Sequence, residues 1–292
     1  MLNMNKLLLQ FFLLGSGYAF MFNDFLRFGF RTITSKNGVL WPNVNGMRTK
    51  YNQLPNKNQT LIYPKYYLND FHAYDDGNLN WIAAEECEAA TSGVLSFHFK
   101  DTDGFKANKI VRGSLVEMVN KNLKIKQALD IVDMASGIGY SVNFIDENLP
   151  GNNIIGVEMS PYFIQKSNEL FPMFQILNQN AESTSIEPQS KDIVFISYLF
   201  HELPLEASIN VIRESSRILK KGGILAFMDM KSGSRASNMF SQFIFDRTEP
   251  FLNEYKKFTS DRTQILIDNG FQIVDVEEEI PKTTMFVALK TN

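Results

Sequence analysis

The chain has few residues that could bind a metal or form a cross-link: one cysteine, Cys87, and three histidines among 292 residues. A single thiol excludes an intrachain disulfide, and a structural zinc site needs about four Cys or His ligands, so we expect no metal. Glu86 and Glu88 flank the thiol and favour its protonated form, which argues against a reactive nucleophile. We therefore expect Cys87 to be a buried or partly buried apolar side chain.

The chain also lacks an apolar run long enough to cross a bilayer, which takes about 20 residues. Residues 7–22 are almost wholly apolar, but the run is only 16 residues long and contains Gln10, Gly15 and Gly17. Three interpretations remain open for residues 1–31. They form a signal peptide, an amphipathic helix at a membrane interface, or a cap helix packed on the folded domain.

Charge is unevenly distributed along the chain. The formal net charge is −3, yet residues 1–70 hold eight basic residues against two acidic ones. Such asymmetry is typical of a surface that meets anionic lipid or nucleic acid. The basic residues are scattered and outnumbered by aromatic ones, which favours a membrane surface over a nucleic-acid groove. We expect no nucleic-acid partner. Two interpretations of the basic excess remain: peripheral membrane contact through residues 1–31, or a basic flank that is simply exposed to solvent.

Strands and helices alternate from residue 128 onward, which predicts an α/β fold with helices on both faces of a mostly parallel sheet. Helix signals lie between the strands: Ser160-Pro161 can open a helix, Ser260 can cap one that ends at Gly270, and Asn78 can cap an earlier one. The expected strands are 128–134, 153–157, 174–177, 192–198, 224–228, 271–278 and 283–290. The link between the last two is so short that it permits only an antiparallel pair.

The strand ending at residue 134 leads into a turn of small residues, 135–139, that lets backbone approach a ligand closely. The turn does not match the dinucleotide fingerprint, because Val142 stands where that fingerprint needs Gly or Ala. Asp133 precedes the turn, where it would repel a pyrophosphate and attract an ammonium group. The alternative role for Asp133 is to cap the next helix.

Polar residues also end the strands that follow. Glu158 lies 19 residues beyond Gly139, where a carboxylate can accept hydrogen bonds from both ribose hydroxyls. Asn180 lies in the loop after the third strand, within Gln179-Asn180-Ala181-Glu182, where an amide or carboxylate can recognise an adenine amino group. His201 and Asp229 follow the fourth and fifth strands, so we expect both at the same edge of the sheet. Each could instead be a hydrogen-bonded structural residue.

Together these residues resemble the class I S-adenosylmethionine-dependent methyltransferases, and in particular the branch that includes the ubiquinone and menaquinone biosynthesis enzymes. The resemblance covers about residues 105–292 and implies a Rossmann-like, seven-stranded sheet with an antiparallel last strand. It implies S-adenosylmethionine as cofactor, with the methionine end held by Asp133, Ala135, Gly137 and Gly139, the ribose by Glu158, and the adenine by Asn180 and Ala181. Two residues depart from the family pattern, since Ala135 replaces a Gly and Asn180 replaces an Asp.

Residues 63–90, with Thr248-Glu249-Pro250 and Tyr255, are similar to an uncharacterised cyanobacterial and plant-plastid methyltransferase group. The stretch is dense in aromatic residues and has no strand of its own, so we expect it to cover the ligand edge as a lid, or else simply to pack. The lid and substrate residues would be Tyr66, Tyr67, Phe71, His72 and Tyr255. The expected units are a segment 1–31, an accessory region 32–104 and the cofactor-binding domain 105–292.

The sequence thus predicts methyl transfer to the oxygen or carbon of a small acceptor that is lipophilic or contains a ring. His201 and Asp229 are the catalytic candidates, because an oxygen or ring-carbon nucleophile benefits from a base. The alternatives are a non-catalytic binding protein with this fold and, less favoured, an NAD-dependent reductase. The methyl donor is an intracellular metabolite, so we expect a cytoplasmic or plastid-stroma-like location, free or peripheral at a membrane.

Overall fold

The computed structural model describes residues 19–44, 55, 58, 60–74, 76–99, 102–124, 128–232 and 248–291. Seven strands in these ranges form one sheet in the order β3-β2-β1-β4-β5-β7-β6. Their bounds are β1 Asp130–Met134, β2 Asn153–Glu158, β3 Gln175–Asn178, β4 Lys191–Ser197, β5 Leu219–Met230, β6 Phe271–Glu277 and β7 Thr283–Lys290. Each expected strand is present, with ends shifted by a few residues.

The strand directions confirm the predicted fold class. Strands β1 to β5 pair in parallel, and β7 runs antiparallel to both of its neighbours, β5 and β6. After β1 the chain adds β2 and β3 on one side and then crosses to add β4 on the other. In open α/β sheets a ligand crevice lies at the carboxyl ends of the strands where the order reverses in this way. The site is therefore expected above β1, β2 and β4.

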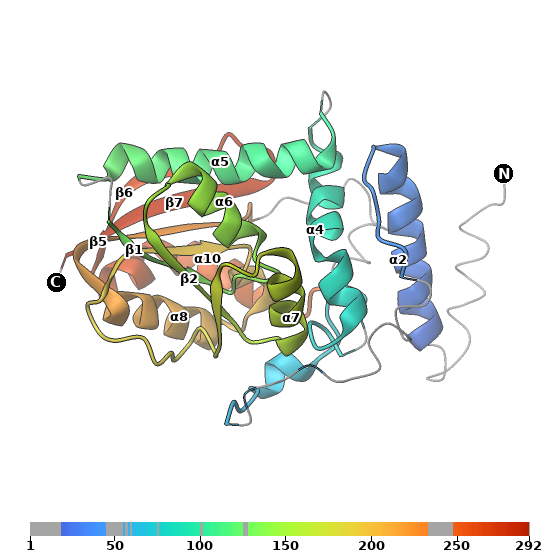
Figure 1. Cartoon of the computed structure of the whole chain (residues 1–292), viewed down its shortest axis with the longest axis horizontal. Coiled ribbons are helices and arrows are strands. Elements are labelled where there is room, and N and C mark those ends of the chain that lie inside the picture. The colour runs from blue at the N-terminus through green and yellow to red at the C-terminus, as the bar shows by residue number, and fades with distance from the viewer. Residues whose placement is uncertain are drawn as a thin grey trace.

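Helices cover both faces of the sheet (Figure 1). On one face, α5 (Gly104–Asn122) and α6 (Tyr140–Asn148) pack on side chains such as Ile131 and Phe195. On the other, α8 (Leu205–Ile218) and α10 (Leu252–Asp268) pack on side chains such as Val132 and Phe227. Because both faces are buried, the central strands are apolar along their length rather than alternating, as the sequence pattern indicated.

Two of the predicted helix starts are wrong. Asn80, not Asn78, caps α4 (Trp81–Ser96), with its side chain accepting from Ala83 N at 2.8 Å. The helix expected to begin at Ser260 begins instead at Leu252, and Ser260 sits inside it, donating to the carbonyl of Lys257. The extra turns of α10 bury Tyr255 and Phe258 in the core, a gain that no local capping signal encodes.

The accessory region packs beyond the end of the sheet. Helix α7 (Pro161–Leu170), capped by Ser160 as predicted, contacts α4. Figure 1 shows α4 with α2 (Ala19–Lys36) beside it on the outer side. A Cβ on Gly93 of α4 would lie 2.9 Å from the ring of Phe30, so the missing side chain lets α2 approach closely.

Two basic residues of α2, Arg27 and Arg31, face inward. Arg31 lies 3.1 Å from the buried carboxylate of Glu86, which also accepts from Tyr74 Oη, and Arg27 stacks on the ring of Tyr74. This packing favours the cap-helix interpretation for the described part of the N-terminal segment, while residues 1–18 lie outside the described ranges. Among the helices that the structure describes, none has the length and hydropathy that crossing a bilayer would need.

Candidate functional site

The turn after β1 has an unusual backbone. Ala135, Gly137 and Gly139 have φ of 56°, 58° and 85°, in the left-handed region that glycine adopts freely. At Gly139 a Cβ would lie 2.3 Å from Ser167 Oγ, so only glycine fits there. Ala135, which stands where the resembling family has glycine, adopts the same backbone form at a cost of about 1–2 kcal/mol. The conformation of the turn is therefore maintained at a cost in local stability.

Asp133 is a fully buried acid with an unused oxygen. Its Oδ2 accepts a 2.5 Å hydrogen bond from Ser141 Oγ, and its Oδ1 has no partner among the described residues. Burial raises the pKa of Asp133 to about 7, against the opposing effects of Ser141 and Arg112. No side chain caps the first turn of α6, so the structure does not support the capping alternative for Asp133. A buried carboxylate with an unused oxygen is suited to a cationic ligand.

Glu158, at the end of β2, joins two segments of the site. Gly137 N donates to its Oε2 at 2.9 Å, and Ser160 N donates to its Oε1 at 2.7 Å. Burial raises the pKa of Glu158 to about 7, although both backbone hydrogen bonds act to lower it. Each carboxylate oxygen has a second lone pair that can accept from a ligand hydroxyl. Glu158 therefore has a structural role, and its contact with a ribose stays a prediction.

The loop after β3 is organised around Glu182, a residue that the sequence analysis quoted without assigning it a role. Its carboxylate accepts from Tyr66 Oη at 2.5 Å and from Asn210 Nδ2 at 2.9 Å. Asn180 turns the loop, with its Oδ1 accepting from Glu182 N at 2.9 Å. Ala181 is buried beside it. Asn180 thus shapes the loop through the side-chain oxygen that it shares with the family's usual Asp.

His201 and Asp229 are in direct contact at the ligand edge. His201 Nδ1 lies 2.7 Å from Asp229 Oδ1, and His201 N donates to Asp229 Oδ2. Burial alone would lower the pKa of His201, but the charges of Asp229, Glu202 and Glu249 raise it to about 9. His201 is therefore mainly an imidazolium at neutral pH, with Nε2 directed away from Asp229.

The structure brings the aromatic stretch to the same place. The ring centroids of Phe71, His72 and Tyr255 lie 6.5, 5.9 and 6.3 Å from that of His201. His72 Nε2 is 3.2 Å from Glu249 Oε1. These four aromatic rings come from three separate parts of the chain and surround one region beside Asp229.

Tyr66 and Tyr67 belong to the short helix η2 (Lys65–Leu68). The hydroxyl of Tyr67 is buried without a hydrogen-bond partner in the described ranges. Burial, and next the charge of Glu158, raises the pKa of Tyr67 well above its usual value. Tyr67 therefore places an unused hydroxyl within electrostatic reach of the proposed ribose acceptor.

One group of side chains in the described ranges has the composition of a metal site. His72, His201 and Glu202 each offer a ligand atom, and these atoms lie within 4.8 Å of one another. Each already has a protein partner: Glu249 for His72, Asp229 for His201, and Asn78 for Glu202. These partners account for the cluster as a network of charged hydrogen bonds, and we assign no metal to it.

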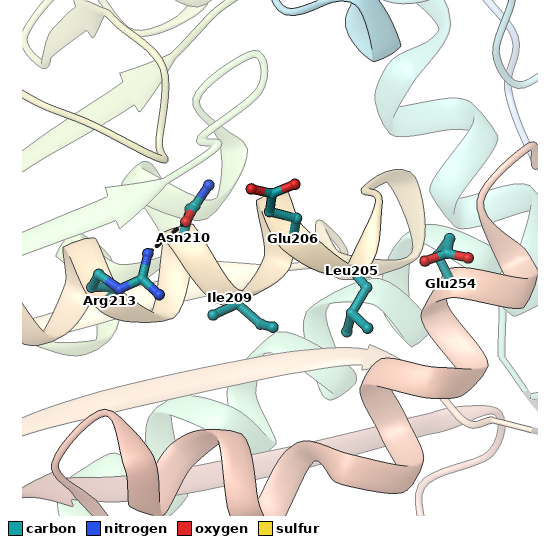
Figure 2. Close-up of a pocket in the computed structure, with 6 residues that line it drawn as sticks. All are labelled: Leu205, Glu206, Ile209, Asn210, Arg213 and Glu254. Carbon is teal, nitrogen blue, oxygen red and sulfur yellow. Dashed lines mark hydrogen bonds between the residues drawn. The ribbon is translucent and has the colours of Figure 1, made fainter.

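Two pockets open away from the turn at 135–139. One, of about 390 Å³, is an open depression lined by Asn180 and by Thr60 to Ile62. The other, of about 370 Å³, lies on the outer surface of α8 (Figure 2). Its residues are Leu205, Glu206, Ile209, Asn210, Arg213 and Glu254. Neither pocket includes Asp133, Glu158 or His201.

Several polar residues of the site carried no usable signal in the sequence. Ser141 orients Asp133, and Glu249 orients His72, but neither belongs to a motif that assigns such a role. Asn78 donates to Glu202, and its carbonyl accepts from Ser160 Oγ, which ties the aromatic stretch to the start of α7.

An acid ending β1, a left-handed turn of small residues, an acid ending β2 and an antiparallel β7 together define the class I methyltransferase fold. Residues 132–227 match the family described as Methyltransferase domain. The predicted resemblance to class I methyltransferases is confirmed, and it extends over this part of the chain. A dinucleotide-dependent reductase, the less favoured alternative, does not fit these findings.

Among curated relatives, the chain is 30% identical over 113 residues to the ubiquinone/menaquinone biosynthesis C-methyltransferase UbiE of Campylobacter jejuni, covering 37% of this chain and 47% of that protein. It is 24% identical over 110 residues to an uncharacterized methyltransferase of Synechocystis, covering 38% and 51%. The chain spans about half the length of these relatives. Among solved structures, Haemonchus contortus phosphoethanolamine N-methyltransferase 2 in complex with S-adenosyl-L-methionine has a TM-score of 0.52 at 15% identity, covering 62% of this chain and 53% of that one.

Proposed function

We propose that this chain transfers a methyl group from S-adenosylmethionine to the oxygen or carbon of a small acceptor that is lipophilic or contains a ring. The observation that supports this most directly is the buried carboxylate of Asp133, whose free oxygen lies beside a turn of small residues. Such an oxygen fits the ammonium of an amino acid and repels a phosphate. S-adenosylmethionine, when bound, supplies a methyl group already activated on a sulfonium sulfur.

The residues divide the donor between them. Asp133 and the backbone of residues 135–139 hold the methionine end, and Glu158 accepts from the ribose hydroxyls. Asn180 and Ala181 border the adenine. Because the donor is already activated, the chain mainly needs to align the nucleophile with the methyl group and exclude water.

His201 and Asp229 act on the acceptor. Asp229 occupies Nδ1 of His201, and Nε2, whose ion-pair partner Glu202 Oε1 is 3.9 Å away, is left to contact the acceptor. A charged His201 donates to an acceptor oxygen and orients it, whereas a neutral His201 takes the acceptor's proton on Nε2. With a pKa of about 9, the neutral form is the minor one at pH 7, so proton removal by this residue becomes faster as pH rises.

Residues 63–74 form a lid in this proposal. Support comes from the hydrogen bond between Tyr66 and Glu182 and from the rings of Phe71 and His72 beside His201. A wall of aromatic rings excludes water and favours an apolar, ring-containing acceptor over a highly polar one. We retain residues 1–31, 32–104 and 105–292 as the proposed units of the chain.

We also propose peripheral attachment to a membrane through residues 1–31, in a cytoplasmic or plastid-stroma-like compartment. The excess of basic residues in the first 70 positions supports this, as do Phe28 and Ile33, which are 70% and 46% exposed on α2. Arg27 and Arg31 point inward, so exposed apolar side chains would supply most of the contact from α2. A variant without residues 1–18 keeps the sequence of α2, and we expect it to sediment less with anionic vesicles than the full chain does. If both chains sediment equally with the vesicles, α2 and not residues 1–18 makes the contact. If neither chain sediments, the proposal of membrane attachment is contradicted.

Two measurements test the main proposal. Calorimetry should detect binding of S-adenosylmethionine to the full chain, and labelled donor incubated with metabolite extracts should yield a labelled small molecule. Donor binding without any transfer would favour the non-catalytic alternative, and absence of binding would contradict the proposal itself.

A further inference from the structure

His72 lies in a tight turn at the ligand edge. The two ends of the turn 71–74 pair as a β-bridge, and His72 and Ala73 between them have φ of 52° and 61°. This left-handed backbone is unfavourable for residues other than glycine, and it persists where the surrounding structure holds it. Here His72 N donates to the carbonyl of Thr248 at 3.0 Å, and His72 Nε2 lies 3.2 Å from Glu249 Oε1. Two neighbouring residues of a distant segment therefore fix the position of the His72 ring.

The turn brings His72 to two other groups that bind protons. A ring nitrogen of His72, a ring nitrogen of His201 and a carboxylate oxygen of Glu202 lie within 4.8 Å of one another. His201 Nε2 is 3.9 Å from Glu202 Oε1, a separation that one water molecule or a small side-chain rotation bridges. Asn78 Nδ2 donates to Glu202 Oε2 at 3.2 Å and so orients the carboxylate. The three groups form a continuous series in which each member can accept and release a proton.

Exposure to solvent increases along this series. The side chain of His201 is 7% exposed, that of Glu202 is 22% exposed and that of His72 is 35% exposed. On its other side, His201 faces the carboxylate of Asp229, which is only 5% exposed. The series therefore connects the buried ring of His201 with the surface, whereas Asp229 does not.

Methylation of a hydroxyl group releases one proton. The oxygen forms a bond to the methyl carbon, the bond between carbon and sulfur breaks with its electron pair staying on sulfur, and the hydroxyl proton passes to Nε2 of His201. Asp229 Oδ1, 2.7 Å from Nδ1, stabilises the imidazolium that forms. His201 must then lose this proton before it can accept one from the next acceptor molecule.

We infer that Glu202 and His72 relay this proton from His201 to the solvent. Glu202 accepts the proton from Nε2 of His201 and passes it to the ring of His72, which releases it at the surface. An imidazole is suited to this step because it can accept a proton on one nitrogen and release one from the other. The inference rests on the proposed function, and it gives the lid a part in proton transfer in addition to excluding water.

Nitrogen-15 NMR of the full chain tests the relay without any ligand. The chain has only three histidines, so labelling them gives few signals, and the exchange of the Nε2 proton of His201 with water is measured at pH 7. His72→Gln and Glu202→Gln should each slow this exchange at least about tenfold, because each variant loses a proton carrier and keeps a polar side chain. Imidazole added to the solvent should restore the rate in His72→Gln, whose missing ring is at the exposed end. His98→Gln, which changes the third histidine after the end of α4, is the matched control and should leave the rate unchanged.

A structural role for these residues predicts a change of the opposite sign. If His72 and Glu202 only shield His201 from water, their replacement exposes the ring and accelerates the exchange, which would overturn the inference. Slower exchange in Glu202→Gln alone would also overturn it, because the proton would then leave from Glu202 directly, and so would an unchanged rate in both variants. An unchanged His98 signal in each variant shows that the fold is retained. These measurements need neither donor binding nor methyl transfer, so the relay and the proposed function can fail separately.

Discussion

Donor affinity should depend steeply on pH between 8 and 6, because two buried acids of the donor site titrate there. Burial raises the pKa of Asp133 and of Glu158 to about 7 in the free protein. Arg112 acts against this shift at Asp133, and the charge of Glu202 adds to it at Glu158. Asp133 must be ionised to pair with an ammonium, and an ionised Glu158 is the better acceptor for ribose hydroxyls.

The size of the effect follows from the two pKa values. Each acid is about nine-tenths ionised at pH 8 and about one-tenth ionised at pH 6. If the bound donor requires both acids in the charged form, its affinity falls about 100-fold over this range, or about 2.7 kcal/mol. Donor affinity falls as pH falls, because the donor binds the deprotonated acids and protons compete with it for them.

Calorimetry of S-adenosylmethionine binding at pH 6, 7 and 8 measures this directly. Glu158→Gln removes one of the two titrations, so the variant should bind more weakly at pH 8 and lose only about tenfold by pH 6. The ratio of wild-type to variant affinity at each pH cancels titration of the donor itself. A wild-type affinity that changes by less than about threefold, or an unchanged profile in Glu158→Gln, would refute the assignment of these acids.

Three further results are expected. Glu158→Ala should weaken donor binding by about 2–3 kcal/mol. It should also lower the free energy of unfolding, because the amides of Gly137 and Ser160 lose their acceptor. An unchanged free energy of unfolding in a denaturant titration would contradict the structural role. Tyr67→Ala and His201→Ala should lower turnover more than they lower donor affinity, and the loss of turnover in His201→Ala should be about 10²-fold. With a hydroxyl acceptor, the wild-type rate should rise about tenfold per pH unit until near pH 9. Undiminished turnover in His201→Ala would assign that residue a structural role. Arg31→Ala should cost about 2 kcal/mol of stability by leaving Glu86 with one fewer partner, whereas Lys36→Ala, on the exposed side of α2, should be neutral; equal effects would show that the ion pair contributes little.

The sequence by itself determined the sheet and the donor end of the site. Runs of apolar residues with turns between them specify strands that are buried on both faces, and the short link after residue 278 admits only an antiparallel pair. Asp133 and Glu158 could be predicted because each ends a parallel strand, and the carboxyl ends of such strands meet at one edge. These properties depend on residues close together in the chain.

The tertiary structure alone decided how distant segments meet at that edge. Tyr66 reaches Glu182 across 116 positions, and Asn78 reaches Glu202 across 124. The same holds for the inward direction of Arg31 and for the early start of α10, which follows from burying Tyr255 and Phe258. Local patterns specify elements, but hydrogen-bond partners and burial depend on the packing of elements far apart in sequence, and these contacts orient the side chains of the site.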